Sequence, residues 1–240
     1  MKSLKALLVN LKTYYLMTFR NTFLVIAHYL LPVLFYLMFS VVFVGINEEN
    51  KKTIIMSMTA FGLAMNSYIG LPGSVVRYAI GDIKRAYIAG GIKLWHVFVC
   101  AAISNMVHCF VTSMVILFTA KPLFGAVMPE SMGWYFLALF ISIVLSTLMG
   151  VVIGMFSKTE GVATIISQAT FLPSLFLSGT MVPIEFLPKI LQTISDLIPL
   201  KHTYILLQGY DQRSLIFSLG FIVGLLVLLV IRYRFIIRRE

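Results

Sequence analysis

The stretch WYFLALFISIVLSTLMGVVIGMF, residues Trp134–Phe156, contains no Asp, Glu, Lys or Arg in 23 positions. A helix needs roughly 20 apolar residues to cross the hydrocarbon core of a bilayer, which is about 30 Å thick. Lipid cannot form hydrogen bonds with an open backbone, so such a run must pair its peptide groups internally. The run also lacks the strict alternation of apolar and polar residues that a membrane β-barrel strand needs. We therefore predict a membrane-spanning helix here.

Five further runs share these properties, and the composition of the whole chain agrees with them. Of its 240 residues 60% are hydrophobic and only 12% are charged, and the mean hydropathy is +0.96. A soluble globular chain has roughly 45–50% apolar and about 25% charged residues. This composition excludes a soluble enzyme, a secreted disulfide scaffold and a disordered chain. The predicted fold is an all-α membrane protein with a single domain, residues 1–240, and six transmembrane helices at Thr22–Ile46, Thr53–Val76, Leu94–Ala120, Trp134–Phe156, Gly161–Met181 and Leu215–Ile231.

The distribution of Lys and Arg between the spans predicts the orientation. With the N-terminus inside, the inner segments carry 13 basic and 3 acidic residues, and the outer segments carry 6 of each kind. The net charge of +10 then lies entirely on one side, as the positive-inside rule requires. We expect a multi-pass protein of the cell membrane with both termini in the cytoplasm. The basic charge is therefore interpreted as a membrane feature, and no nucleic-acid partner is expected.

Residues 1–21 precede the first span and are predicted to form a basic amphipathic helix. Their apolar side chains repeat at helical spacing, and the lysines lie mainly off that stripe. A helix of this kind lies in the headgroup plane of the membrane. A solvated basic flank explains the same pattern and is compatible with it. The stripe consists of Leu4, Leu8, Leu11 and Tyr15, with Leu7 and Tyr14 beside it.

The longest inner loop, Arg77–Lys93, reads RYAIGDIKRAYIAGGIK. It mixes charged residues with Ile80, Ile83, Tyr87 and Ile88, a composition that suits a short helix on the membrane surface. The loop is long enough to contact a partner, although a solvated connection between two spans is the simpler explanation.

The outer segment Ser178–Asp211 combines apolar residues with prolines. Pro183, Pro188 and Pro199 forbid one continuous helix, because each lacks a backbone donor and its ring clashes with the preceding turn. The pieces between them are apolar, and a short helix is predicted from about Pro188 to Leu197. We expect a broken helical excursion that dips into the interface or re-enters the membrane. Such backbone is tolerated where protein or a cavity surrounds it.

The chain offers few residues for chemistry. No Gly-Lys pair occurs, so the nucleotide-binding pattern G-x-x-x-x-G-K-[ST] is absent. Neither H-E-x-x-H nor C-x-x-C occurs. The predicted spans hold no Asp or Glu that could couple transport to a proton or sodium gradient. We therefore predict no catalytic, metal or cofactor site in this chain, and any transport must draw its energy from elsewhere.

Three amide side chains and two histidines lie inside the predicted spans, away from their ends. Asn66, Asn105 and Gln168 suit hydrogen bonds between helices. His28 and His108 suit neutral, partnered core histidines better than proton relays. A polar residue within a span is otherwise a marker of function, so a role in transport stays open for all five.

Taken together, these segments resemble the type 2 permease of ABC transporters, the ABC-2 type. The strongest local match is SGTMVPIEFLP, Ser178–Pro188, followed by Ile198-Pro199-Leu200, which is similar to the family signature L-S-G-x-x-x-P-x-x-x-L-P … P-L. A weaker match, Gly81–Arg85, is similar to the G-x-x-K/E-R stretch of the coupling helix. It lacks the acidic residues that normally precede the glycine and the Thr-Pro that normally follows. The resemblance covers nearly the whole chain.

The resemblance implies that two permeases pair and that two separate ATP-binding subunits, which hold ATP and Mg²⁺, dock beneath them. Residues 77–93 would be the cytoplasmic coupling helix, and residues 178–211 the extracellular broken helices. The substrate path would run along the dimer seam between spans two and five, although plain packing explains each path residue equally simply. The implied site residues are Asp82, Lys84, Arg85 and Tyr87 for ATPase coupling, Asn66, Tyr68, Phe171, Leu172 and Phe176 for the substrate path, and Gly179, Pro183, Pro188 and Pro199 for the extracellular gate.

The leading hypothesis is the permease subunit of an ATP-driven exporter in the membrane. Its substrate would be hydrophobic or amphipathic: a drug, a peptide antibiotic, a lipid or a lipid-linked glycan. The expected partners are an ATP-binding cassette subunit, a second permease copy in a homodimer or related heterodimer, and membrane lipid. One alternative is a membrane-embedded enzyme, and another is a passive channel or scaffold with no ATPase partner. For the enzyme, the only polar material is His28, Asn66, Asn105 and His108.

Overall fold

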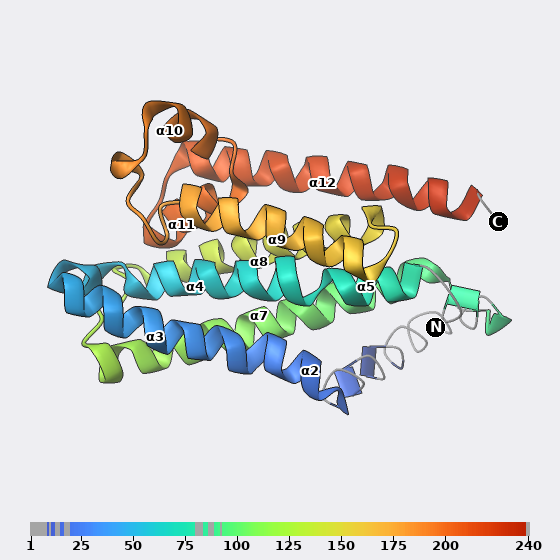
Figure 1. Cartoon of the computed structure of the whole chain (residues 1–240), viewed down its shortest axis with the longest axis horizontal. Coiled ribbons are helices and arrows are strands. Elements are labelled where there is room, and N and C mark those ends of the chain that lie inside the picture. Colours follow the sequence, from blue (N-terminus) through green and yellow to red (C-terminus); the bar gives the residue numbers. More distant parts are fainter. Residues whose placement is uncertain are drawn as a thin grey trace.

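A computed structural model of the chain describes residues 9, 11–12, 15–16, 20–79, 84–85, 89–91 and 93–238. Throughout these residues every regular element is a helix, and six helical stretches are long and apolar enough to cross a membrane (Figure 1). The predicted all-α membrane fold with six spans is confirmed. The stretches are Ile26–Ile46, Ile54–Tyr78, Leu94–Phe124, Met132–Phe156, Glu160–Leu177 and Gln212–Ile236.

Each of the first two spans contains a π-helical turn between two α-helical pieces. The first span has the predicted bounds, and it ends where the side chain of Asn47 accepts a hydrogen bond from Glu49 N and starts a 3₁₀ turn. The second span continues three residues beyond its predicted end. The pieces are α2 (Thr22–Val25), η1 (Ile26–Leu30), α3 (Leu31–Ile46), the connecting turn η2 (Glu48–Lys52), α4 (Ile54–Ala64), η3 (Met65–Gly70) and α5 (Pro72–Ala79).

The third and fourth spans are the uninterrupted helices α7 (Leu94–Phe124) and α8 (Met132–Phe156). α7 passes its predicted end by one turn and stops at Gly125, whose φ of 65° is the left-handed conformation that closes many helices. α8 starts two residues earlier than predicted. Ser131 caps it, because its side chain accepts a hydrogen bond from the backbone N–H of Trp134.

The fifth span, α9 (Glu160–Leu177), is shorter than predicted. The expected end at Met181 was wrong by one turn, since the chain leaves the helix at Ser178. The Ser178 hydroxyl donates to the carbonyl of Leu175 at 3.0 Å, and Gly179 then takes a φ of 83°. A hydroxyl that bonds back to its own helix competes with continued helical pairing, so this turn is encoded locally.

The outer segment forms three separate pieces, as its prolines predicted. Each piece starts at a proline: Pro183 and Pro188 cap the first two, and Pro199 is the first residue of the third. Proline suits these positions, because the first N–H groups of a helix have no partner within the helix. The depth of these pieces in the membrane stays a prediction. They are η4 (Ile184–Phe186), α10 (Lys189–Ser195) and α11 (Pro199–Gln208).

The sixth span, α12 (Gln212–Arg238), continues seven residues past its predicted end. Its arginines do not stop the helix. Arg232 Nε donates to the carbonyl of Met155 at 3.0 Å, and its guanidinium lies 5.1 Å from the centre of the Phe156 ring. The charge is therefore accommodated against α8, and the helix extends beyond the purely apolar run.

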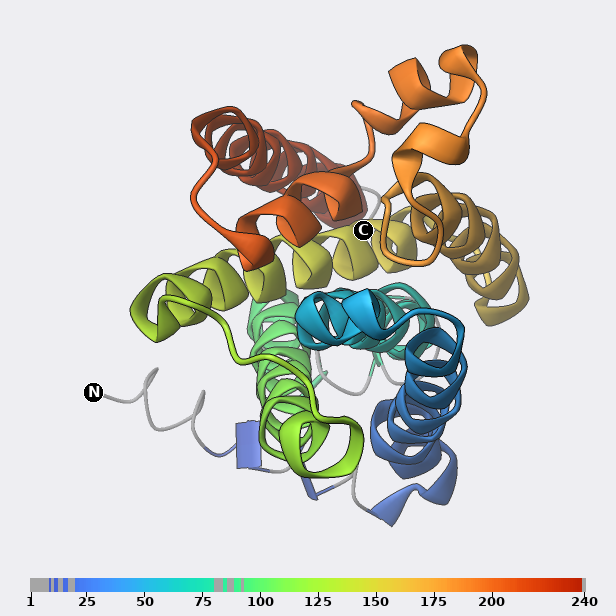
Figure 2. The ribbon, with the colours of Figure 1, turned by 90° about the vertical axis from the view of Figure 1, so that its left-hand side faces the viewer.

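The spans differ strongly in burial because α4 lies at the centre of the bundle. Every residue of α4 is buried, and α3, α7, α8, α9 and α11 all contact it (Figure 2). Over the most apolar window of each span, 89% of the second span is buried, against 17% of the first and of the sixth. The first and sixth spans therefore present most of their surface to whatever surrounds the bundle.

Two glycines of α8 let the fourth span approach the second span closely. A side chain at Gly150 would overlap the backbone carbonyl of Ser67, and a Cβ at Gly154 would lie 2.5 Å from the Cβ of Val75. The spacing G-x-x-x-G is a frequent means of close helix packing in membranes. The contact between α8 and the second span thus depends on the absence of side chains at these two positions.

The beginning of α2 and the end of α12 lie at the same end of the bundle (Figure 1). This agrees with an even number of spans between them. Of the predicted interfacial helix, residues 1–21, the structure describes only residues 9, 11–12, 15–16 and 20–21, and all of these except Asn21 are helical. The other residues of that segment lie outside the described part of the chain.

Candidate functional site

A cluster of buried polar side chains joins the first three spans. His28 Nδ1 and Asn66 Oδ1 share a hydrogen bond of 3.2 Å, and Asn66 Nδ2 donates to Thr112 Oγ1 at 3.3 Å. Thr112 Oγ1 in turn donates to the backbone carbonyl of His28 at 3.2 Å. The three residues are at most 5% exposed. They form a closed ring of hydrogen bonds, in which each partner comes from a different span.

His108 extends this cluster toward the N-terminal segment. Its ring stacks on His28 with 4.6 Å between the ring centres, and the ring of Tyr15 stacks at 5.6 Å. His108 Nδ1 shares a hydrogen bond of 2.6 Å with the hydroxyl of Tyr29, and Nε2 shares one of 3.2 Å with the hydroxyl of Ser104. The prediction that both histidines are partnered is therefore confirmed.

The cluster lies between the two π-helical turns. His28 belongs to η1 and Asn66 to η3, and the two turns contact each other. Gly70, the last residue of η3, makes room for this contact, since a Cβ there would lie 2.9 Å from His28 Cε1. A π-helical turn interrupts the regular i to i+4 pairing and is often found at functional sites. The first two spans are therefore irregular at the place where they are joined by hydrogen bonds.

A second group of hydrogen bonds lies beside this cluster and joins spans two, three and four. Asn105 Nδ2 donates to the hydroxyls of Ser67 at 3.0 Å and Thr147 at 2.9 Å. All three residues are buried, and the hydroxyl of Ser67 also lies 3.5 Å from Cys109 Sγ. Asn105 of α7 thus connects the second span to the fourth.

We expect Asn105→Leu to lower the free energy of unfolding by about 1 kcal/mol, because it removes two interhelical hydrogen bonds that contribute about 0.6 kcal/mol each in membrane proteins. Thermal unfolding of the purified protein in detergent measures the effect. Val107→Leu, on the exposed side of the same helix, is the matched control and should leave the transition unchanged. Equal unfolding temperatures for the two variants would contradict the role given to Asn105.

The turn after α9 fixes the start of the outer segment. The hydroxyl oxygens of Ser178 and Thr180 lie 2.8 Å apart, and each lies 3.0 Å from the carbonyl oxygen of Leu175, so the two hydroxyl protons are shared among these three contacts. Gly179 lies between them, and a Cβ there would be 3.2 Å from Ile184 Cγ1. Since its φ is also positive, Gly179 is the residue type that this turn requires.

A cavity of about 410 Å³ opens between this turn and the outer ends of α3 and α4. Its wall combines apolar side chains with the polar groups of Asn47, Asn50, Thr53 and Thr180. Ser57 and Tyr204 also line the cavity, and Ser57 donates to the hydroxyl of Tyr204 at 3.1 Å and so ties α4 to α11. Burial raises the pKa of Tyr204. A mixed lining of this kind can accept an amphipathic molecule.

A set of charged and polar contacts fastens the outer pieces to the sixth span. Lys201 Nζ lies 2.6 Å from Asp196 Oδ1, and Arg213 lies 3.4 Å from the other oxygen of the same carboxylate. The hydrogen bond from Lys201 holds the pKa of Asp196 below its ordinary value. His202 shares hydrogen bonds with Ser214 Oγ at 3.1 Å and with the backbone carbonyl of Asp196 at 2.9 Å, and burial lowers the pKa of His202. These contacts hold α10, α11 and α12 together.

The opposite end of the bundle carries a bidentate ion pair between spans two and five. Arg77 Nε and Nη2 lie 3.1 and 3.0 Å from the two carboxylate oxygens of Glu160. Both side chains are partly exposed, so we treat the pair as a positional link rather than a large source of stability. It joins the end of α5, where the longest inner loop begins, to the start of α9.

The sequence pattern of one protein family, described as ABC-2 type transporter, matches residues 5–210. The chain belongs to this family. The match covers the first five spans and the outer segment up to Tyr210, and it leaves out residues 1–4 and the sixth span. A comparison with curated protein sequences gives no match.

As an ABC-2 type membrane domain, the chain is the membrane component of a transporter and a multi-pass membrane protein. The residues predicted for its substrate path occupy two different environments. Asn66 and Tyr68 are fully buried, and Asn66 faces the first and third spans through its hydrogen bonds. Phe171 is also buried and contacts Phe61 of α4, with 5.9 Å between the ring centres. Leu172 and Phe176, in contrast, are 50% and 52% exposed. The five residues therefore do not form one continuous surface.

One of the exposed rows of side chains on α9 contains an amide. Ile165, Gln168, Leu172 and Phe176 are exposed and recur at helical spacing. An amide is costly to place against lipid, and polar groups in spans normally face protein or a water-filled space. Gln168, which the sequence suggested for a hydrogen bond between helices, is thus exposed on the lateral surface of the bundle.

The residues predicted for the gate and for ATPase coupling are spread along the chain. Gly179 and Pro183 line the outer cavity, whereas Pro188 is exposed and Pro199 is buried at the start of α11. At the inner end, Lys84 and Arg85 are helical. Asp82 and Tyr87 lie outside the described residues, as do residues 80, 81, 83, 86, 88 and 92 of the predicted coupling helix.

The sequence indicated His28, Asn66, Asn105 and His108 as polar groups in the spans but not which of them form pairs. Thr112 and Ser67, which close the two groups of hydrogen bonds, were not considered at all. A signal was present, because Ser104, Asn105, His108, Thr112 and Ser113 recur on one side of α7 at helical spacing. In the described part of the chain, no three His, Cys, Asp or Glu side chains come together as a metal site.

Proposed function

We propose that the chain is the permease subunit of an ATP-driven exporter and that a separate ATP-binding subunit moves it. The observation that carries the proposal is the charge distribution of this ABC-2 type membrane domain. In the six spans, every Asp, Glu, Lys and Arg lies within five residues of a span end. Ion-driven transporters commonly use charged side chains inside the membrane as relays, but the described spans hold no Asp, Glu, Lys or Arg in their middle, and His28 and His108 within the spans are hydrogen-bonded to neighbouring side chains. The energy for transport therefore comes from a partner.

The inner end is the place where the partner docks. Lys84 and Arg85 lie in the loop between spans two and three, and the ion pair between Arg77 and Glu160 links the base of this loop to the fifth span. A movement of the loop would be transmitted to the fifth span through this ion pair. It would also reach the two π-helical turns of the first two spans, at which we propose that these spans bend. If this loop lies on the cytoplasmic side, both chain ends and the basic inner segments also lie in the cytoplasm.

A second permease copy completes the path. The stripe of Ile165, Gln168, Leu172 and Phe176 is apolar except for one amide, and such a face suits contact with another protein surface or with a substrate better than contact with lipid alone. The outer cavity, with its mixed lining, lies at the outer end of α4 and suits release of an amphipathic substrate. We therefore propose a hydrophobic or amphipathic substrate, such as a drug, a peptide antibiotic, a lipid or a lipid-linked glycan.

Co-purification tests the docking site. The tagged wild-type chain, extracted in mild detergent, should retain an ATP-binding subunit, which mass spectrometry identifies by a peptide with a G-x-x-x-x-G-K-[ST] motif. Lys84→Glu/Arg85→Glu should reduce its recovery at least tenfold. The matched control is Lys51→Glu/Lys52→Glu, an adjacent basic pair at the opposite end of the bundle. Undiminished recovery with the first variant, or equal loss with both, would contradict the assigned docking site.

A further inference from the structure

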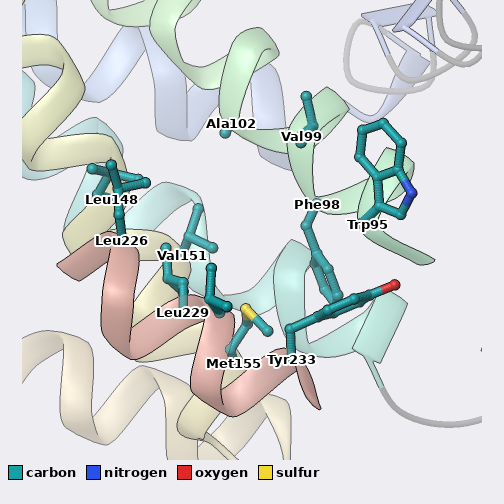
Figure 3. A pocket seen from close by; sticks show the side chains of 11 residues that line it. Trp95, Phe98, Val99, Ala102, Leu148, Val151, Met155, Leu226, Leu229 and Tyr233 are labelled. Atoms are coloured by element: carbon teal, nitrogen blue, oxygen red, sulfur yellow. The ribbon is translucent and has the colours of Figure 1, made fainter. Parts of the chain in front are cut away.

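A shallow apolar groove runs along the outside of the bundle between the third and sixth spans. Its volume is about 250 Å³. Phe98 and Val99 of α7 form one wall, Leu229 and Tyr233 of α12 the other, and α8 contributes the floor, which includes Met155 (Figure 3). Phe98 and Tyr233 meet edge to face with 6.4 Å between ring centres. The groove is therefore bordered by two helices that do not pack closely along this length.

The size, position and lining of the groove suit a single flexible hydrocarbon chain. The volume lies below the range of about 300–1,000 Å³ that is typical of sites for drug-sized molecules. Leu226 and Val230 of the groove wall are 47% and 54% exposed, so the groove faces the membrane. Because its lining is made of hydrocarbon and aromatic side chains, a lipid tail can fill it without leaving a polar group unpaired.

The inner end of the groove has the features of a membrane–water interface with basic charge. Trp95 and Tyr233 line the groove there, and both residue types are enriched at the level of lipid headgroups. Basic residues lie at the ends of all three bordering helices. Among the described residues the acid nearest in sequence to these ends is Glu160, which is paired with Arg77. The basic residues are Lys93 before α7, Lys158 after α8, and Arg232 and Arg234 in the last turns of α12.

From this combination we propose that the groove binds one anionic phospholipid, with an acyl chain between α7 and α12 and its phosphate among the basic residues at the inner end. Charge complementarity selects the occupant. A zwitterionic lipid would fill the groove equally well but would gain little from the surplus of basic groups. The bound lipid would join α12 to α7 where the two helices do not contact each other closely, and so would support the position of the sixth span.

The chain provides its own reporter for this site, since Trp95 lines the groove and the only other tryptophan is Trp134 at the opposite end of α8. The experiment uses the full-length Trp134→Phe variant in phosphatidylcholine nanodiscs, without any ATPase. A small, equal fraction of brominated phosphatidylglycerol or brominated phosphatidylcholine is added, and quenching of Trp95 fluorescence gives the relative affinities. We expect a preference for phosphatidylglycerol of at least about fivefold, the factor that one basic residue near anionic lipid typically contributes.

Two kinds of variant separate the headgroup contact from the acyl-chain contact. Arg234→Gln should reduce the preference about fivefold, whereas Lys189→Gln, on the exposed outer helix α10, should not change it. Ala102→Phe fills the groove and should reduce quenching by brominated phosphatidylglycerol to the level of bulk lipid. Val99→Phe serves the same purpose if the first variant does not fold. Equal quenching by both brominated lipids, or quenching that survives the filled groove, would overturn the proposal.

Discussion

Gly150→Leu is expected to remove most of the folded protein and to lower the free energy of unfolding by more than about 3 kcal/mol. Overpacking of a well-packed interior costs about 1–3 kcal/mol when neighbouring side chains can move aside. At Gly150 the obstacle is the backbone carbonyl of Ser67, with Leu71 Cδ2 at 3.2 Å behind it. A carbonyl within a helix cannot rotate away, so α8 would have to separate from the second span. The yield of monodisperse protein in detergent and its melting temperature measure the effect.

The sixth span offers a matched control for this prediction. It contains the same G-x-x-x-G spacing at Gly220 and Gly224, and a Cβ at either position meets nothing within 4 Å. Gly220→Leu and Gly224→Leu should therefore leave yield and melting temperature close to wild type. If Gly150→Leu behaves like these two variants, the close contact between the fourth and second spans is not what holds the bundle together.

The spans could be predicted from the sequence because their signal is local. A run without charge that is long enough for the bilayer has few alternatives to a helix. The errors were confined to ends where a specific contact decided the outcome. Ser178 stops the fifth span through a hydrogen bond to Leu175, and Arg232 lets the sixth span continue through its contacts with Met155 and Phe156. Composition does not report such contacts.

The polar clusters could be predicted only in part, because they depend on pairs far apart in the sequence. His28 and Asn66 are 38 positions apart, and Asn105 and Thr147 are 42 apart. Each residue was visible as a polar group in an apolar run, but nothing in the sequence says which polar groups share a depth and a face. The π-helical turns that bring His28 and Asn66 together have no sequence pattern of their own here.

The predicted substrate path also depends on which side chains share a face, and the sequence does not show this. The path residues were chosen by family resemblance, and the structure divides them between buried positions on the second span and α9 and the exposed stripe of α9. Only Leu172 and Phe176 lie where a second copy or a substrate could reach them without a conformational change. The buried members, among them Asn66, would become accessible only if the first two spans move apart at η1 and η3.

In the described part of the chain, buried hydrogen bonds join the spans, and no Asp, Glu, Lys or Arg lies in the middle of a span. We therefore propose that ATP turnover in a separate subunit and the conformation of this membrane domain depend on each other. Such coupling between two sites commonly changes equilibria by a factor of about 5–150. It is carried, in our proposal, by the inner loop that contains Lys84 and Arg85.

The most direct measurement is the ATP turnover of the co-purifying ATP-binding subunit, alone and reassembled with this chain in nanodiscs. We predict that turnover changes by about fivefold or more on assembly. With Lys84→Glu/Arg85→Glu, the rate should return to that of the free subunit, even at protein concentrations high enough for the variant to bind the ATP-binding subunit. An ATP-binding subunit whose turnover is the same with and without the membrane domain would contradict the account.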